Sequence, residues 1–164
     1  MNVSPKAFSR RIYHRPRDLW ADIRDILGRS GDMRALMRGE TLASDFRERL
    51  MLAVTEVNAC RYCAYYHARQ ALAAGLPRSE LEALTEGDFG SSPAHERPAL
   101  LYAQHWAEAD GLPDPAARDH IVALFGSETA LAIDLALRVI RIGNLLGNTF
   151  DYVLYRLSGG RWGH

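Results

Sequence analysis

The chain has no excess of charge of either sign, because 20 lysines and arginines are balanced by 20 aspartates and glutamates. A net charge of zero gives no overall electrostatic reason to bind nucleic acid or a membrane surface. The first segment is locally basic, with Arg10, Arg11, His14, Arg15 and Arg17. A short arm of this kind is more often solvated or used in a subunit contact. We therefore expect no nucleic-acid partner.

Long apolar runs are also missing. No run approaches the roughly 20 residues that cross a bilayer, and residues 1–17 carry charges without the apolar segment of a secretory signal. We therefore expect a cytoplasmic protein that does not enter a membrane. Cysteine is scarce, with only Cys60 and Cys63. In the cytoplasm such a pair is more often catalytic or metal-binding than a structural disulfide.

Strand-like alternation, internal repeats and low-complexity tracts are absent as well. Most segments carry apolar residues at helical spacing, and the length of 164 residues fits one domain. We predict a single all-α domain over residues 1–164, with a basic arm at 1–16 and a helical hairpin at 40–76. Other helices are expected at 16–27, 30–37, 79–86, 93–109 and 115–125. A last long helix follows Gly126; it is apolar almost all round, so it should be the central buried element.

Residues 41–74 favour helix throughout, and they could form one helix or two. A helix of about 30 residues is long for a globular protein, so we predict two helices with a sharp turn near Asn58-Ala59. On a straight helix, Glu48 would lie about 18 Å from the first cysteine. A reversal near Asn58 instead brings Glu48 and His67 roughly level on antiparallel helices.

Both cysteines and His67 lie in one short stretch. If residues 60–67 are helical, Cys60, Cys63 and His67 project from one narrow face, at about 100° of rotation per residue. Two thiols beside an imidazole suit dithiol redox chemistry: a thiolate attacks a peroxide or disulfide, and the second thiol resolves the oxidised first one. A carboxylate would orient His67. The candidates are Glu48, across the turn, and Glu56, four residues before Cys60.

Glu48, eleven intervening residues and then Cys60-x-x-Cys63-x-x-x-His67 resemble the signature of the carboxymuconolactone decarboxylase / alkyl hydroperoxidase D superfamily. The resemblance covers about residues 40–76 closely. It implies an all-α, alkyl hydroperoxidase D-like fold with the cysteines at the start of a helix. It also implies roles: Cys63 as nucleophile, Cys60 as resolving thiol, His67 as proton acceptor and Glu48 as relay carboxylate.

The resemblance further implies a thiol-dependent alkyl hydroperoxidase or disulfide oxidoreductase without a metal or organic cofactor. Electrons would come from a dithiol donor such as a lipoyl-carrying protein, and the chain would form a homotrimer or homohexamer. The decarboxylase branch generally lacks the cysteine pair, which argues against that activity. The best-studied members carry a histidine where this chain has Tyr62. A phenol is no base at neutral pH but can donate a hydrogen bond, so Tyr62 and Tyr66 are secondary site candidates.

Other interpretations of the same residues stay open. Cys60, Cys63 and His67 supply three possible zinc ligands, with Glu48 or His105 as a fourth, although no second ligand pair at metal spacing accompanies them. The cysteines could also be buried residues without a function. A last alternative is a redox-sensing or structural member of the family with no enzymatic activity.

Three polar residues interrupt the last apolar helix: Asn144, Asn148 and Asp151. The simpler interpretation is that they cap a break in that helix. The alternative is that they line the active site or a contact between subunits.

Overall fold

The computed structural model describes residues 7–163, and within them the chain forms seven α-helices and no strand. The all-α prediction is confirmed. The helices are α1 (Pro16–Leu27), α2 (Ser30–Met37), α3 (Ser44–Asn58), α4 (Arg61–Ala73), α5 (Arg78–Thr85), α6 (Arg97–Glu108) and α7 (Pro115–Leu157). The first six residues of the basic arm lie outside the described residues.

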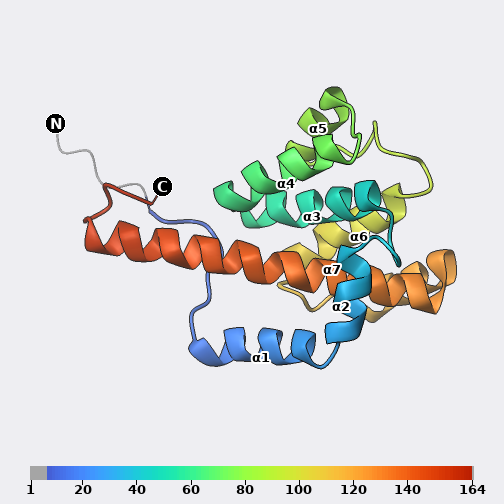
Figure 1. Cartoon of the computed structure of the whole chain (residues 1–164). Helices are drawn as coiled ribbons and strands as arrows, with labels where there is room; N and C mark the ends of the chain where they lie inside the picture. The colour runs from blue at the N-terminus through green and yellow to red at the C-terminus, as the bar shows by residue number, and fades with distance from the viewer. Residues whose placement is uncertain (1–6, 164) are drawn as a thin grey trace.

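The predicted reversal within residues 41–74 is present, and α4 returns alongside α3 (Figure 1). α3 ends at Asn58, and Ala59 adopts the left-handed conformation with φ 53° and ψ 39°. A residue with a Cβ adopts this conformation only infrequently. Contacts from elsewhere in the fold therefore have to hold the turn, and α7 supplies them, as described below.

The helix expected at 93–109 is shorter than predicted. Residues 94–96 form a turn, and α6 begins only at Arg97, with Pro98 in its first turn. Proline is favourable there because the first N–H groups of a helix have no partner within the helix.

α3 lies at the centre of the fold, where it packs against α4, α5, α6 and α7. Most of its 15 residues are buried. We expected the last long helix to be the central buried element, and this is only partly right. α7 crosses α3, but Leu146, Phe150 and Leu157 on its other side are 43%, 57% and 80% exposed. The middle of α7 is thus largely buried, whereas several apolar side chains nearer its C-terminal end are exposed.

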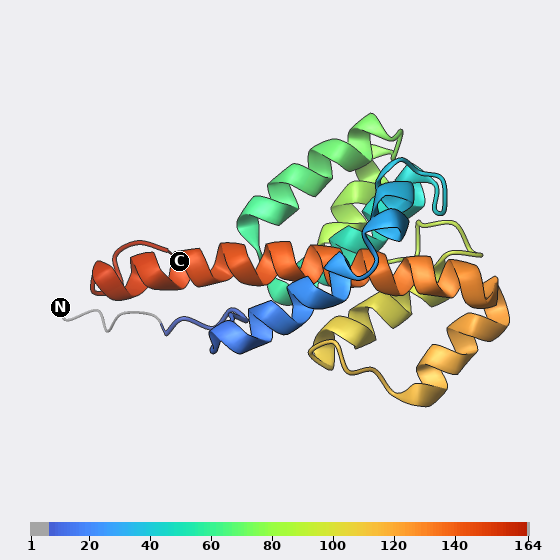
Figure 2. The same cartoon turned by 60° about the horizontal axis from the view of Figure 1, so that its bottom comes forward.

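α7 consists of two helical pieces. Gly126 between them has φ 79° and ψ 161°, outside the helical region. Figure 2 shows the piece before Gly126 folded back at an angle to the longer piece. The predicted end of one helix before Gly126 and start of another after it are therefore confirmed.

Within the described residues, α7 is also the one helix long and apolar enough to span a membrane, judged by length and composition alone. We expected no such run. The core helix of a soluble protein passes the same test. α7 packs against α1, α2, α3, α4 and α6 and buries the polar side chains of Asn144, Asn148 and Asp151. Its apolar residues are therefore explained in part by packing inside the protein.

Candidate active site

Cys60 and Cys63 lie at the N-terminus of α4. Cys60 is the N-cap, in an extended conformation with φ −82° and ψ 104°, so it precedes the helix in which we expected it. Its Sγ accepts a hydrogen bond from the backbone N–H of Cys63 at 3.4 Å. The two Sγ atoms lie 2.8 Å apart, and both cysteines are free thiols. The start of the helix thus directs N–H groups at the Cys60 sulfur, where they stabilise an anion.

The pKa values of the two thiols are shifted in opposite directions. A hydrogen bond from the Cys63 thiol lowers the pKa of Cys60, and the backbone N–H groups of Cys63 and Tyr62 lower it further. Burial raises the pKa, but by less, so the pKa of Cys60 is about 6. The same hydrogen bond, together with burial and the charge on Cys60, raises the pKa of Cys63 far above its ordinary value. The shared hydrogen bond therefore makes Cys60 the more acidic thiol of the pair.

Glu48 and His67 contact each other across the hairpin, as the predicted turn requires. Oε2 of Glu48 lies 2.7 Å from Nδ1 of His67. Oε1 of Glu48 accepts hydrogen bonds from Nε and Nη2 of Arg47 at 3.2 and 3.0 Å. Nη1 of Arg47 in turn donates to the carbonyls of Leu36 and Met37 at the end of α2. The carboxylate is held at both oxygens, so it fixes the imidazole and directs any proton exchange to Nε2.

A cavity of about 390 Å³ opens beside Cys63. Its lining combines Cys63 and His67 with apolar side chains from α2, α3 and α7, among them Met37, Met51 and Ile140. Cys60 does not line this cavity and is only 1% exposed. A molecule in the cavity therefore meets the Cys63 sulfur first.

α7 passes close beneath the cysteines because it carries glycine there. A Cβ on Gly147 would lie 2.9 Å from Sγ of Cys60 and 3.3 Å from Cδ2 of Tyr62. A Cβ on Gly143 would lie 3.8 Å from Sγ of Cys63, which is an ordinary contact. Position 147 therefore excludes a side chain unless Cys60 moves, whereas position 143 tolerates one.

Residues 31–109 match the model of the carboxymuconolactone decarboxylase family. The matched segment runs from α2 to the end of α6 and contains Glu48, both cysteines and His67. The match supports membership of this family. No curated protein matches it. The family includes enzymes, and the match stops before α7, the helix that passes beneath the cysteines.

Outside the matched segment, two fully buried asparagines of α7 hold the turn between α3 and α4. Nδ2 of Asn58 donates to Oδ1 of Asn144 at 3.1 Å, and Nδ2 of Asn144 donates to Oγ1 of Thr55 at 3.1 Å. Nδ2 of Asn148 donates to the carbonyl of Asn58 at 2.7 Å. The prediction that these residues cap a helix break is wrong, because α7 is continuous there. They support the site from behind.

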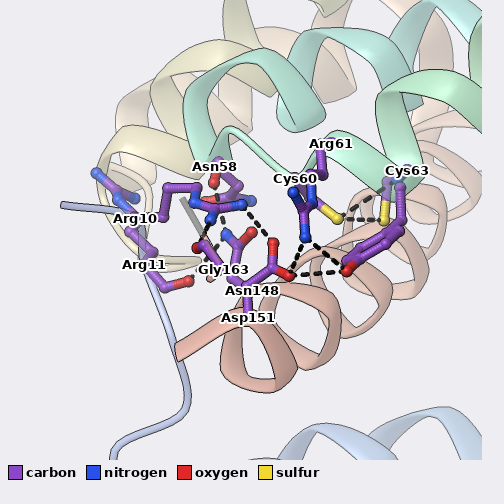
Figure 3. A network of polar contacts seen from close by, with 10 residues as sticks. Arg10, Arg11, Asn58, Cys60, Arg61, Cys63, Asn148, Asp151 and Gly163 are labelled. Atoms are coloured by element: carbon purple, nitrogen blue, oxygen red, sulfur yellow. Dashed lines mark hydrogen bonds and ion pairs between the residues drawn. The ribbon is translucent and has the colours of Figure 1, made fainter. Parts of the chain in front are cut away.

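Asp151, four residues after Gly147, is fully buried and lies at the centre of the network in Figure 3. Oδ1 accepts hydrogen bonds from Nη2 of Arg61 and Oη of Tyr62, both at 2.7 Å, and Oδ2 accepts one from Nη1 of Arg10 at 2.7 Å. Arg61 and Tyr62 are the two residues between the cysteines. Tyr62 is a hydrogen-bond donor, as expected, but it donates to Asp151. Sequence analysis did not identify Arg10 as a site residue; its only signal was membership of the basic arm.

Of the remaining candidates, Tyr66 lines the cavity beside Cys63, whereas Glu56 lies outside it. Glu56 lies close to Gly87 and lines a second cavity of about 300 Å³ next to Cys60, while Glu48 makes the contact with His67. The ring of Tyr66 packs edge-on against His67, with centroids 5.0 Å apart.

The geometry does not favour the zinc alternative. In the part of the chain that the structure describes, no three His, Cys, Asp or Glu side chains are grouped so as to hold a metal ion. The ring of His105 accepts a hydrogen bond from the backbone of Asp114 at 3.4 Å.

Proposed function

We propose that this chain is a thiol-dependent hydroperoxidase or disulfide oxidoreductase of the alkyl hydroperoxidase D type. It cycles Cys60 and Cys63 between a dithiol and a disulfide. The observation that carries the proposal is the cavity beside Cys63: one of two thiols 2.8 Å apart lines it, together with a histidine held by Glu48. The cycle uses no metal or organic cofactor.

The cycle begins at Cys63, the thiol that lines the cavity. The Cys63 thiolate attacks one oxygen of a hydroperoxide ROOH and breaks the O–O bond, which gives a sulfenic acid and RO⁻, released as ROH after protonation. Cys60 then attacks the oxidised sulfur and expels hydroxide, which takes up a proton to become water. The protein is left with a Cys60–Cys63 disulfide, and two electrons have passed to the peroxide.

His67 and Glu48 manage the protons. The Cys63 thiol has to lose its proton before it attacks, and His67 in the wall of the same cavity takes that proton. Glu48 stabilises the imidazolium that forms, because its carboxylate is hydrogen-bonded to Nδ1. The imidazolium then returns the proton to the leaving RO⁻. The apolar lining favours organic hydroperoxides over hydrogen peroxide, because their carbon groups are desolvated on binding.

The electron donor and the assembly belong to the same proposal. A dithiol, such as a lipoyl group on a carrier protein, reopens the disulfide and becomes a disulfide itself. The exposed apolar side chains of α7, among them Leu146 and Phe150, support assembly into a homotrimer or homohexamer, because large exposed apolar patches mark interaction sites. We propose a cytoplasmic location, where such donors keep the thiols reduced.

The second candidate is a redox sensor without turnover. The observation that favours it is the contact of Tyr62 with Asp151. Tyr62 stands at the position of the family's second histidine, and its hydroxyl donates a hydrogen bond to Asp151 rather than to a thiol. A sensor would form the disulfide once with peroxide and would not be reduced rapidly by a dithiol.

Peroxide consumption and mass spectrometry of the reduced protein test both candidates. With cumene hydroperoxide and dihydrolipoamide, the wild type should turn over, and without the donor each chain should lose two hydrogen atoms. Cys63→Ser should do neither, whereas Cys60→Ser should stop at a sulfenic acid that dimedone traps. Turnover by Cys63→Ser would refute the proposed cycle, and a single oxidation without turnover in the wild type would favour the sensor.

A further inference from the structure

The Asp151 carboxylate is fully inaccessible to solvent and contacts both residues that lie between the cysteines. Its three donors come from two segments: Arg61 and Tyr62 from the first turn of α4, and Arg10 from the N-terminal arm, 141 residues away in sequence. A buried carboxylate is stable only when it is paired and hydrogen-bonded. Asp151 therefore stays ionised only because Arg10 and Arg61 pair with it.

Arg10 is the more enclosed of the two cations. Its side chain is 12% exposed, against 47% for Arg61. The Arg10 guanidinium also donates to the carbonyl of Gly163 in the C-terminal tail. The arm is held near the site by further hydrogen bonds, since the carbonyl of Arg11 accepts from Nδ2 of Asn148 at 3.0 Å. The contacts of the N-terminal arm and of the C-terminal tail thus hold Arg10 against α7, the helix beneath the cysteines.

The charge of Asp151 acts on the Cys60 thiol. Burial by itself raises the pKa of Asp151, but hydrogen bonds from Tyr62, Arg10 and Arg61 lower it below its ordinary value. At Cys60 the hydrogen bond from the Cys63 thiol is the largest effect and lowers the pKa, whereas the negative charge of Asp151 raises the pKa by less than burial does.

Other charged and titratable groups also face Cys60 and Asp151. Arg61 and Tyr62 of α4 contact Asp151, and Cys63 contacts Cys60. Glu56 of α3 lines the second cavity together with Cys60 and Arg61. A negative charge on Asp151 destabilises the Cys60 thiolate, and a cation paired with Asp151 reduces this destabilisation.

We propose that Arg10 is a positioning residue of the dithiol site: by pairing with Asp151 it holds the two residues between the cysteines in place and screens Cys60 from the Asp151 charge. This rests on the dithiol function proposed above. The N-terminal arm is then part of the redox site, because it completes the charge balance beneath the thiols.

The test is a titration of thiolate absorbance at about 240 nm on the reduced, full-length protein, which reports the lower thiol pKa. Arg10→Met should raise this pKa by up to about 0.5, because Asp151 has a smaller effect on Cys60 than the hydrogen bond from Cys63, and should reduce the thiolate fraction near pH 6 about two-fold. Arg10→Lys should restore most of the wild-type value. Arg11→Met is the matched control, because the Arg11 guanidinium donates to the carbonyls of Ala107 and Glu108 instead.

A double-mutant cycle separates charge from packing. Asp151→Asn alone should lower the thiol pKa, and Arg10→Met should have no further effect on it in the Asp151→Asn background. An Arg10→Met effect that persists in this background, or one that equals the effect of Arg11→Met, would overturn the proposal. If Arg10→Met does not fold, an unchanged thiol pKa in Asp151→Asn overturns it by itself.

The titration needs no turnover, so its outcome is independent of the proposed function. An inactive wild type with the predicted titration would end the peroxidase proposal and leave the role of Arg10 in place. An active wild type with an unchanged thiol pKa in Arg10→Met and Asp151→Asn would do the opposite.

Discussion

The close approach of α7 to the cysteines makes a sharp prediction for Gly147→Ala. The new Cβ would lie 2.9 Å from Sγ of Cys60, where an ordinary contact needs about 3.5 to 4 Å. Cys60 or α7 must therefore shift by roughly 0.6 to 1 Å. Gly143→Ala is the matched control, because it adds the same methyl group four residues earlier on the same helix, at 3.8 Å from Sγ of Cys63.

The comparison isolates the packing cost. Both substitutions replace a helical glycine by alanine and gain about 1 kcal/mol of helix propensity. Only Gly147→Ala overpacks the site, at a cost of about 1 to 3 kcal/mol. Gly143→Ala should therefore be more stable than wild type by up to about 1 kcal/mol, and Gly147→Ala should be less stable than Gly143→Ala by about 1 to 3 kcal/mol.

Thermal unfolding of the reduced proteins measures this difference, which corresponds to roughly 2 to 12 °C in Tm for a chain of this size. The displaced Cys60 sulfur should also lose part of its hydrogen bond to Cys63. Peroxide-driven disulfide formation should then be slower in Gly147→Ala, and the lower thiol pKa should rise. Equal stability of the two variants, with the same thiol titration, would refute the placement of α7 against Cys60.

Three further predictions concern the relay, the thiols and the turn. Glu48→Gln should lower peroxide turnover by about ten- to a hundred-fold, since a positioned acid–base group contributes at least that much, while the exposed Glu82→Gln should not; equal activity of all three proteins would exclude the relay. Because the pKa of Cys60 is lowered to about 6 in the folded protein, against about 8.5 when unfolded, the stability that Cys60 contributes is complete above about pH 8.5 and is lost as the pH falls through 6. Urea unfolding of wild type and Cys60→Ser should therefore diverge as the pH rises from 6 to 8, and parallel curves would contradict the assigned thiolate. Asn144→Ala should cost about 1 to 3 kcal/mol in urea unfolding, because the buried amide of Asn58 and the hydroxyl of Thr55 lose their partner; a stability equal to wild type would show that Asn144 does not hold the turn.

Local patterns were sufficient to predict much of the hairpin. The length of residues 41–74 and the polar Asn58 predicted the reversal, and with it that Glu48 can contact His67; the preference for Glu48 over Glu56 came from the family resemblance. The structure bears out that contact at 2.7 Å. These features depend on residues close together in sequence, where helical periodicity and turn preferences act directly. The single residue by which Cys60 was misplaced reflects the uncertainty of helix ends.

Sequence patterns were enough to predict a set of helices and a motif that brings two thiols, a histidine and a carboxylate within reach of one another. The contacts beneath that motif became visible in the folded chain alone: Gly147 against Cys60, Asn144 and Asn148 on the turn, and Asp151 joined to Arg10. The fold also makes α3 the central helix and leaves several apolar side chains nearer the C-terminal end of α7 exposed. The physical reason is that these contacts join residues 86 to 141 positions apart, so no local periodicity specifies them, and they form only when α7 packs across the hairpin.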